Sequence, residues 1–249
     1  MNASRRITLA LFAAPLALAI SACSGGAADG EIAEGEALDP IAAPEGGSWL
    51  DVVTQTEEYG YVLGNPDAPI KLIEYGSFTC GTCARFTMEG SEPLKQDYVS
   101  TGLVSYELRN LDRNGVDTVI SAITRCTAPE AFHPLADQVW LNFETVMQGV
   151  QSADLGASAS LPQEQQWVYV AQESGLLDFF AARGISRDQA ASCLSDYDAV
   201  LNFSNATNAI ANEMGATGTP SFYVNGSKVD GVSWLDLEPI LRRAGAREE

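Results

Sequence analysis

A short apolar strand followed closely by two cysteines is the feature that most limits how this chain can fold. Residues 70–75 read IKLIEY, a β-branched and aromatic run of the kind that forms a buried strand. CGTC follows at positions 80–83, and the residues up to 99 lack strand alternation, so we expect a helix that starts at the cysteines. Residues 104–108 alternate between apolar and polar, as in a strand with one buried face. The order strand, helix, strand predicts two parallel strands joined by a right-handed crossover.

The pattern changes after the second strand. From about residue 116 to 215 there is little alternation, and apolar residues within 130–150 recur at three- and four-residue spacing, as in a helix. Residues 151–162 form a clear loop, and we expect Gly175 and Gly184 to end further helices. The middle of the chain therefore predicts an all-helical insertion.

Strand character returns near the end of the chain. Residues 221–224 and 227–229 flank Asn225-Gly226, a strong signal for a two-residue hairpin turn. An apolar helical stripe follows from Trp234 to Leu241. The complete order predicts an α/β thioredoxin-like fold, a central mixed sheet flanked by helices and interrupted by a helical subdomain.

Composition excludes several classes of function. The 249 residues are 46% hydrophobic, which is enough for a large core, and the formal charge of −19 repels nucleic acid. A single histidine, His133, leaves little for a histidine metal cluster or a Ser/His triad, and we interpret it as structural or as a surface residue. We expect no metal, no organic cofactor and no nucleic-acid partner.

The first residues have the layout of a secretory signal. Arg5 and Arg6 precede an apolar run too short to span a bilayer comfortably, and residues 19–23 read AISAC. This ending resembles a bacterial lipobox, so we expect a lipoprotein-type signal peptide at 1–22 and lipidation of Cys23. The alternative is an ordinary signal peptide that leaves Cys23 as a free thiol.

An acidic segment rich in glycine follows the signal. Residues 24–48 contain six acids and no base, so they predict a flexible, self-repelling tether, with the ordered part beginning near Trp49. A disordered tail without an anchoring role is the alternative. The expected divisions are 1–22 signal peptide, 23–48 tether, 49–114 first part of the thioredoxin-like domain, 115–215 helical insertion and 216–249 second part.

The position of the CxxC pair gives it chemical meaning. At a helix start, unpaired N–H groups and the helix dipole favour the thiolate of Cys80, which becomes a nucleophile near neutral pH. Cys83 lies one turn further on and should be more buried, so it can resolve a mixed disulfide formed at Cys80. A structural zinc half-site and a passive disulfide are the alternatives, although zinc needs four ligands and no second CxxC exists.

Thr219 and Pro220 directly precede the third strand. Proline suits the first position of a strand, and a cis peptide bond is plausible where the chain turns tightly. A trans proline in a loop is the alternative.

Together these motifs identify a family. SFTCGTCARF after IKLIEYG, with GTPSFYVNG further on, resembles the DsbA-type thiol-disulfide oxidoreductases of the bacterial envelope, including lipoprotein and periplasmic members. The resemblance implies that Cys80 attacks, that Cys83 resolves, and that Thr219 and Pro220 face the active site and contact the substrate. Glu74 matches a buried glutamate proposed to move the proton of the resolving cysteine, and a solvated carboxylate at the strand end is the alternative.

The resemblance also implies partners and a location. We expect an envelope enzyme that forms or rearranges disulfides in exported proteins with cysteines, a redox partner that resets the CxxC pair, and membrane attachment through the lipid on Cys23. Cys126 and Cys193 predict a structural disulfide, as in some DsbA-like proteins, with two separate thiols as the alternative. We expect a monomer.

Two departures from the family bear on the direction of the reaction. Gly81-Thr82 stands where the family usually has proline and a ring, which predicts a less acidic Cys80 and a less oxidising couple. Thr219 replaces the valine of the best-known oxidants. A reductase or isomerase is therefore one alternative function, and a lipid-anchored, non-catalytic binding module is another.

Overall fold

The computed structural model describes residues 34–247, so the predicted signal peptide 1–22 and Cys23 lie outside the described residues. Within 34–247, six strands form one mixed sheet in the order β1-β2-β4-β3-β5-β6. β3 and β4 run parallel, and the other neighbours pair antiparallel. The strands are β1 (Val53–Gln55), β2 (Tyr61–Leu63), β3 (Ile70–Gly76), β4 (Val104–Asn110), β5 (Ser221–Val224) and β6 (Ser227–Lys228).

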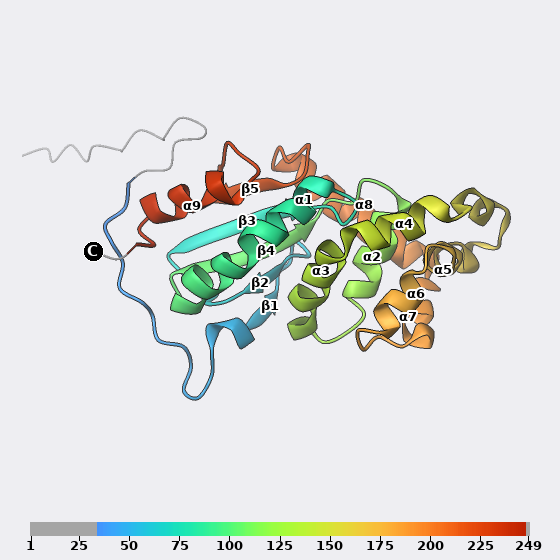
Figure 1. Cartoon of the computed structure of the whole chain (residues 1–249), viewed down its shortest axis with the longest axis horizontal. Coiled ribbons are helices and arrows are strands. Elements are labelled where there is room, and N and C mark those ends of the chain that lie inside the picture. Colours follow the sequence, from blue (N-terminus) through green and yellow to red (C-terminus); the bar gives the residue numbers. More distant parts are fainter. Residues whose placement is uncertain (1–33, 248–249) are drawn as a thin grey trace, which may run out of the picture.

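Helices cover the sheet and also form a separate group beside it (Figure 1). A long helical segment connects β3 to β4, and it consists of α1 (Gly81–Phe86), η2 (Thr87–Ser91), η3 (Leu94–Tyr98) and η4 (Val99–Thr101). The insertion contains α2 (Gly115–Thr124), η5 (Pro129–Ala131), α3 (Phe132–Leu141), α4 (Phe143–Ser152), η6 (Leu155–Ser160), α5 (Gln163–Glu173), α6 (Leu176–Ala181), α7 (Arg187–Leu194) and α8 (Tyr197–Glu213). The remaining helices are η1 (Trp49–Asp51) and α9 (Trp234–Arg243).

The predicted strand-helix-strand unit is present and places the cysteines at one edge of the sheet. β3 pairs with β4 along its whole length, from Ile70 beside Val104 to Gly76 beside Asn110. The carboxyl ends of both strands therefore meet at the same edge. The CxxC segment follows β3 directly at this edge, where parallel strands of open α/β sheets usually build their sites.

The prediction of a single buried face for β4 was wrong. All seven residues of β4 are buried, including Glu107 and Arg109 on the polar face. Arg109 Nε donates to Glu107 Oε1 at 2.8 Å, and Thr56 Oγ1 donates to the same carboxylate oxygen at 2.8 Å. Buried charges are tolerated when they are paired and hydrogen bonded, so the polar face of β4 can be buried although it carries Glu107 and Arg109.

Two further elements differ from the prediction. β1 and β2, which are three residues each, were missed because strands this short carry almost no alternation signal. The helical pattern at 130–150 is split at Asn142, whose Nδ2 donates to Gln138 O at 2.8 Å. Such a hydrogen bond from a side chain to a backbone carbonyl competes with the backbone hydrogen bonds of the helix, and the helix is interrupted at this residue.

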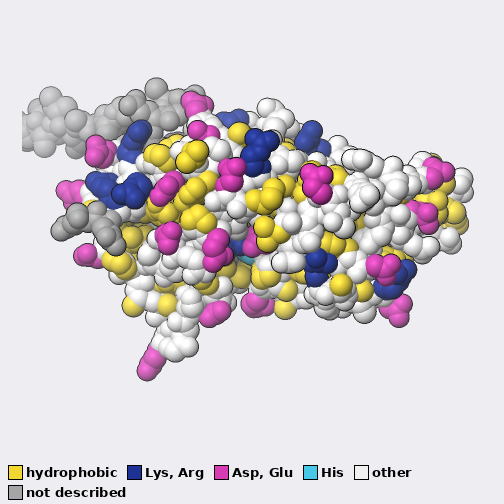
Figure 2. All heavy atoms as spheres, in the orientation of Figure 1, with side chains coloured by type: hydrophobic (Ala, Val, Ile, Leu, Met, Phe, Trp, Pro, Cys, Tyr) yellow, Lys and Arg dark blue, Asp and Glu magenta, His cyan; other side chains and the backbone are white. Residues whose placement is uncertain are grey.

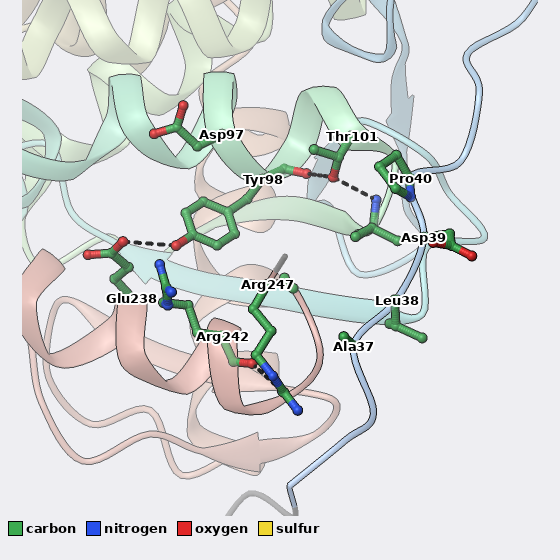
Figure 3. A pocket seen from close by; sticks show the side chains of 12 residues that line it. Ala37, Leu38, Asp39, Pro40, Asp97, Tyr98, Thr101, Glu238, Arg242 and Arg247 are labelled. Carbon is green, nitrogen blue, oxygen red and sulfur yellow. Dashed lines mark hydrogen bonds between the residues drawn. The ribbon is translucent and has the colours of Figure 1, made fainter. Parts of the chain in front are cut away.

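The prediction of a flexible tether up to residue 48 was wrong for residues 35–41. Gly35 N donates to Arg243 O at 2.9 Å, and Ile41 N donates to Thr101 O at 2.8 Å. The segment runs past the carboxyl end of α9 and lines one side of a cavity of about 590 Å³, in which Tyr98 Oη donates to Glu238 (2.9 Å; Figure 3). Backbone groups make these contacts, so an acidic, glycine-rich sequence does not prevent them.

Acidic side chains are spread over the face shown in Figure 2, with basic and apolar groups between them. This distribution agrees with the interpretation of the negative charge as a solvated surface. No helix within residues 34–247 is both long and apolar enough to cross a bilayer.

Candidate active site

The two CxxC thiols lie at the amino end of α1. Cys80 is the residue before the first turn, and Cys83 lies inside that turn. Both side chains are buried, Cys83 completely and Cys80 with 6% of its surface exposed. Both are free cysteines. The expected difference in burial is therefore present, and Cys80 is the thiol that an incoming partner can reach.

A buried carboxylate that the sequence analysis missed holds the loop in front of Cys80. Asp117 Oδ1 accepts a hydrogen bond from Thr79 N at 2.8 Å, and Oδ2 accepts from Ser77 Oγ at 2.9 Å and Arg113 N at 2.9 Å. Thr79 Oγ1 also donates to Oδ2, at 3.0 Å. This network fixes the three residues that bring Cys80 to the helix start. Asp117 lies 40 positions after Ser77, so no local sequence signal marks the contact.

Two aromatic side chains pack against the loop of residues 77–79 that precedes Cys80. Trp140 Nε1 donates to Ser77 O at 3.1 Å, and its ring lies 5.0 Å from the ring of Phe78. Trp140 and Phe78 are both fully buried. α3 of the insertion thus contacts the backbone that carries the reactive thiol.

The Thr219-Pro220 loop lies against Cys80, as expected. β5 pairs with β3, with Ser221 opposite Tyr75, and this brings the loop to the edge of the sheet. The bond between Thr219 and Pro220 is cis. Cys80 Sγ donates to Thr219 O at 3.2 Å.

The surroundings of Cys80 lower its pKa from 9.0 to about 5. A hydrogen bond with the Cys83 side chain contributes most, and the Thr219 side chain and the backbone N–H groups of Cys83 and Thr82 add to it, while burial opposes it. Thr219 Oγ1 is buried with no partner among the described residues, so it is free to donate to the thiolate. The stabilisation comes from groups of the CxxC turn and of Thr219. The expectation that Cys80 is less acidic than in relatives with a ring in the dipeptide stays a prediction.

Cys83 has the opposite electrostatics. Burial raises the pKa of the Cys83 thiol well above its usual value, and the hydrogen bond with Cys80 and the charge of Glu74 act in the same direction. The thiolate is thus favoured at Cys80 and disfavoured at Cys83.

Glu74 lies inside the protein, on β3. It is fully buried, so the alternative of a solvated carboxylate is wrong. Burial raises the pKa of Glu74 to about 8, and the hydrogen bond that Tyr106 Oη donates to Oε2 at 2.6 Å partly offsets this rise. Glu74 Oε1 has no hydrogen-bond partner among the described residues. A carboxyl group that titrates near neutral pH, with one oxygen unpaired, is suited to proton transfer.

Cys126 and Cys193 lie elsewhere. They form a disulfide with Cα atoms 6.2 Å apart, which joins the end of α2 to α7. His133 is also buried, and its Nε2 donates to Tyr61 O at 2.9 Å. Burial lowers the pKa of His133 to about 3, so it is neutral and structural. Within residues 34–247, no group of three or more His, Cys, Asp or Glu side chains is arranged to hold a metal ion.

Comparison with known proteins agrees with this geometry. A family model described as Thioredoxin matches residues 56–242, which is most of the chain and includes the site. The chain belongs to this thioredoxin family. Its predicted thioredoxin-like fold with a helical insertion is thereby confirmed.

Solved structures similar to this thioredoxin-family chain include a protein-disulfide isomerase and a DsbA protein. The crystal structure of a protein-disulfide isomerase from Novosphingobium aromaticivorans is 29% identical, with a TM-score of 0.67, and the match covers 74% of this chain and 97% of that one. Wolbachia pipientis alpha-DsbA1 has the same fold at 21% identity, with a TM-score of 0.57 over 74% of this chain and 89% of that one.

Sequence relatives of the chain carry oxidoreductase names. A putative protein-disulfide oxidoreductase of Rickettsia bellii is 28% identical over 78% of this chain and 67% of its own length. A second one, from Rickettsia typhi, is 26% identical over 74% of this chain and 61% of its own length. The chain thus spans about two thirds of the length of these relatives.

Proposed function

We propose that this DsbA-like protein forms disulfides in exported proteins by exchange through the Cys80–Cys83 pair. The observation that carries the proposal is the opposite electrostatics of two thiols within one helical turn. The pKa of Cys80 is lowered to about 5, whereas that of Cys83 is raised well above its usual value. A stabilised thiolate at Cys80 makes it a good leaving group and makes the motif disulfide reactive.

The exchange proceeds in two steps. A substrate thiolate attacks Cys80 Sγ of the enzyme disulfide, which forms a mixed disulfide and releases the electron pair to Cys83. Cys83 takes up a proton, for which the carboxyl group of Glu74 is the buried donor. A second substrate thiolate then attacks the substrate sulfur of the mixed disulfide, which creates the substrate disulfide and releases Cys80 as a thiolate. The substrate loses two electrons and the enzyme disulfide gains them.

Thr219 and Pro220 form the proposed contact with the substrate chain. Thr219 O lies 3.2 Å from Cys80 Sγ, so a polypeptide bonded to that sulfur must pass beside the loop. Backbone groups in such a place bind any sequence through main-chain hydrogen bonds. The proposed substrates are accordingly polypeptides with cysteines and not one small molecule.

A disulfide isomerase is the second candidate. It is favoured by the Novosphingobium aromaticivorans structure, a protein-disulfide isomerase that is 29% identical to this chain. An isomerase uses the same mixed disulfide, but it works from the reduced form. The acidity of Cys80 favours the oxidant, because a stable reduced form belongs to an oxidising couple.

The proposed location is the periplasmic side of the cell envelope, with the protein attached to a membrane through lipid on Cys23. The signal-like residues 1–22 and the AISAC ending support it. The Cys126–Cys193 disulfide supports it as well, since structural disulfides persist in oxidising compartments. Mass spectrometry of the mature amino terminus tests it: a diacylglyceryl cysteine at position 23 is expected, and an unmodified terminus would contradict the anchor.

The reduction potential of the CxxC pair tests the proposed direction. We expect a value near the oxidising end of the family, about −120 mV, in glutathione buffers. A value near that of thioredoxin, about −270 mV, would favour the reductase or isomerase. Oxidation of a reduced two-cysteine peptide tests turnover, with Cys80→Ser as the inactive control. A wild-type protein that binds the peptide and never oxidises it would favour a non-catalytic binding module.

A further inference from the structure

An apolar groove lies beside the CxxC turn, where the insertion meets the rest of the domain. It has a volume of about 520 Å³ and an open mouth. Thr79, the residue before Cys80, is part of its lining, and so are the first residues of α2. Its apolar walls come from four elements and comprise Val116, Met147, Val150, Leu155, Trp167 and Val170.

The groove continues directly from the reactive cysteine. A Cβ atom added to Gly81 would lie 3.6 Å from the ring of Phe143, so the first turn of α4 is next to the CxxC turn. Met147 and Val150 follow Phe143 on the same face of α4, at helical spacing. Four residues of helix advance about 6 Å, which is about two residues of extended chain.

The lining differs in charge from the rest of the molecule. The whole chain has a net charge of −19, whereas the groove contains no Asp or Glu and only one ionisable side chain, the exposed Arg113. Met147, Val150, Leu155 and Trp167 are only partly buried, so apolar surface remains available in the groove. Trp167 stacks on Tyr197 at 5.2 Å, which fixes the plane of the indole.

We propose that this groove binds a large apolar side chain of the substrate polypeptide, two residues from the cysteine held at Cys80. The inference rests on the proposed function, since it names the class of sequence that the enzyme selects. The occupant follows from continuity with Cys80: a polypeptide bonded to that sulfur has its neighbouring side chains within reach of Met147. The expected preference is for phenylalanine or leucine near the cysteine over serine or glutamate.

Methionine methyl signals provide a direct test of binding. The chain has four methionines, and ¹³C-methyl labelling gives separate signals for Met147 and for the exposed Met88 and Met214. The probes are two peptides that differ only in phenylalanine or serine, placed two residues from a serine that replaces the cysteine. We expect the phenylalanine peptide to shift the Met147 signal alone, and the serine peptide to shift none. Equal shifts by both peptides, or no shift at Met147, would overturn the proposal.

Kinetics with the cysteine-containing versions of the peptides test the consequence. Partial burial of one large apolar side chain predicts a kcat/KM about tenfold higher for the phenylalanine peptide. Met147→Glu should remove this preference, while Gln148→Glu, which adds the same charge at an exposed position of α4, should keep it. The preference surviving in Met147→Glu would contradict the groove. If neither peptide is oxidised the proposed function fails, and the methyl signals still report on the groove.

Discussion

The protein has two cysteine pairs whose surroundings differ in almost every respect. Cys80 and Cys83 lie three positions apart at the start of one helix, as free thiols with pKa values shifted in opposite directions. Cys126 and Cys193 lie 67 positions apart and join two elements of the insertion by a disulfide. The first pair is surrounded by groups that distinguish its two sulfurs, and the second pair closes a long loop.

This contrast shows that the role of a cysteine pair depends on what surrounds the sulfurs. A three-residue separation closes too small a loop to stabilise the fold greatly, so the CxxC pair can break and reform at little structural cost. The Cys126–Cys193 loop is long, and its closure restricts the unfolded chain. The following predictions test this contrast, from the largest expected effect to the smallest.

Removing sulfurs from the CxxC pair should stop disulfide exchange, whereas removing the Cys126–Cys193 pair should change it little. Cys80→Ser is expected to abolish disulfide exchange, and Cys83→Ser to accumulate mixed disulfides through Cys80, because the resolving thiol is missing. The Cys126→Ser/Cys193→Ser double variant should exchange disulfides at close to the wild-type rate. Non-reducing gels after mixing the reduced proteins with a disulfide-containing peptide show the trapped species, because Cys80 attacks the peptide disulfide and releases one peptide sulfur as a thiolate. Trapping by the Cys126→Ser/Cys193→Ser double variant would contradict the assignment.

Titration of the reduced protein should show an acidic Cys80. Thiolate absorbance at 240 nm is expected to have its midpoint near pH 5, and Cys83→Ala should move it upward because the Cys83 side chain lowers this pKa most. The folded pKa lies below the ordinary value of 9.0, so the unfolded state binds more protons between these values. The reduced form should therefore gain stability from about pH 5 to 9 relative to the oxidised form, and lose it as the pH falls through 5. A midpoint near 9 in wild-type protein would contradict the thiolate.

Loss of the structural disulfide should lower stability substantially. With 67 positions between the cysteines, the loop-entropy relation gives about 4 kcal/mol for the Cys126→Ser/Cys193→Ser variant. Urea unfolding with the CxxC pair kept oxidised measures it. A loss below about 1 kcal/mol would show that the bridge does not restrict the unfolded chain in the expected way.

Replacing the buried carboxylate under the active-site loop should cost less. In Asp117→Asn, an amide N–H group would face the backbone donors of Thr79 or Arg113, so at least one buried donor loses its acceptor. The expected decrease in the free energy of unfolding is about 2 kcal/mol. The exposed Asp67→Asn is the control, and equal urea midpoints for the two variants would argue against the network.

The smallest expected effect is a shift in pH dependence. Tyr106→Phe removes the hydrogen bond that lowers the pKa of Glu74, so this pKa should rise above its value of about 8. In the reverse of the proposed first step, Cys83 attacks the mixed disulfide and gives its proton to the Glu74 carboxylate. Less carboxylate would then be present at pH 7 to accept this proton, and the pH profile of that step should move upward. Stopped-flow kinetics measure it. Tyr98→Phe, which removes a similar bond to Glu238, should leave the profile unchanged.

Much of the fold could be predicted because its signals are local. The Ile70–Tyr75 strand, the helix start at Cys80 and the Asn225-Gly226 turn are each set by a few consecutive residues. β5 and β6 flank that turn as expected, and Gly175 and Gly184 have positive φ angles at the ends of helices. Short-range patterns therefore predicted most of the topology. They missed the three-residue strands β1 and β2, the helix break at Asn142 and the 3-10 helix η6 within the predicted loop 151–162.

The parts that could not be predicted depend on distant contacts. Asp117 reaches Ser77 across 40 positions, and Tyr106 reaches Glu74 across 32. The residues around Asp117 and Tyr106 in the sequence do not distinguish them from ordinary polar residues of a helix or a strand. The acidity of Cys80 likewise depends on a distant contact, because the groups that stabilise its thiolate include Thr219, which lies 139 positions away.

The hydrogen bonds of residues 35–41 to the domain would limit how far a lipid-anchored form of the protein can move from its membrane. A tether that is free up to residue 48 would extend to about 90 Å from Cys23. With Gly35 hydrogen bonded to Arg243, about 12 residues separate Cys23 from the domain, and their greatest span is about 40 Å. If Cys23 carries the lipid and the proposed function holds, substrate polypeptides would meet the enzyme only within a thin layer next to that membrane.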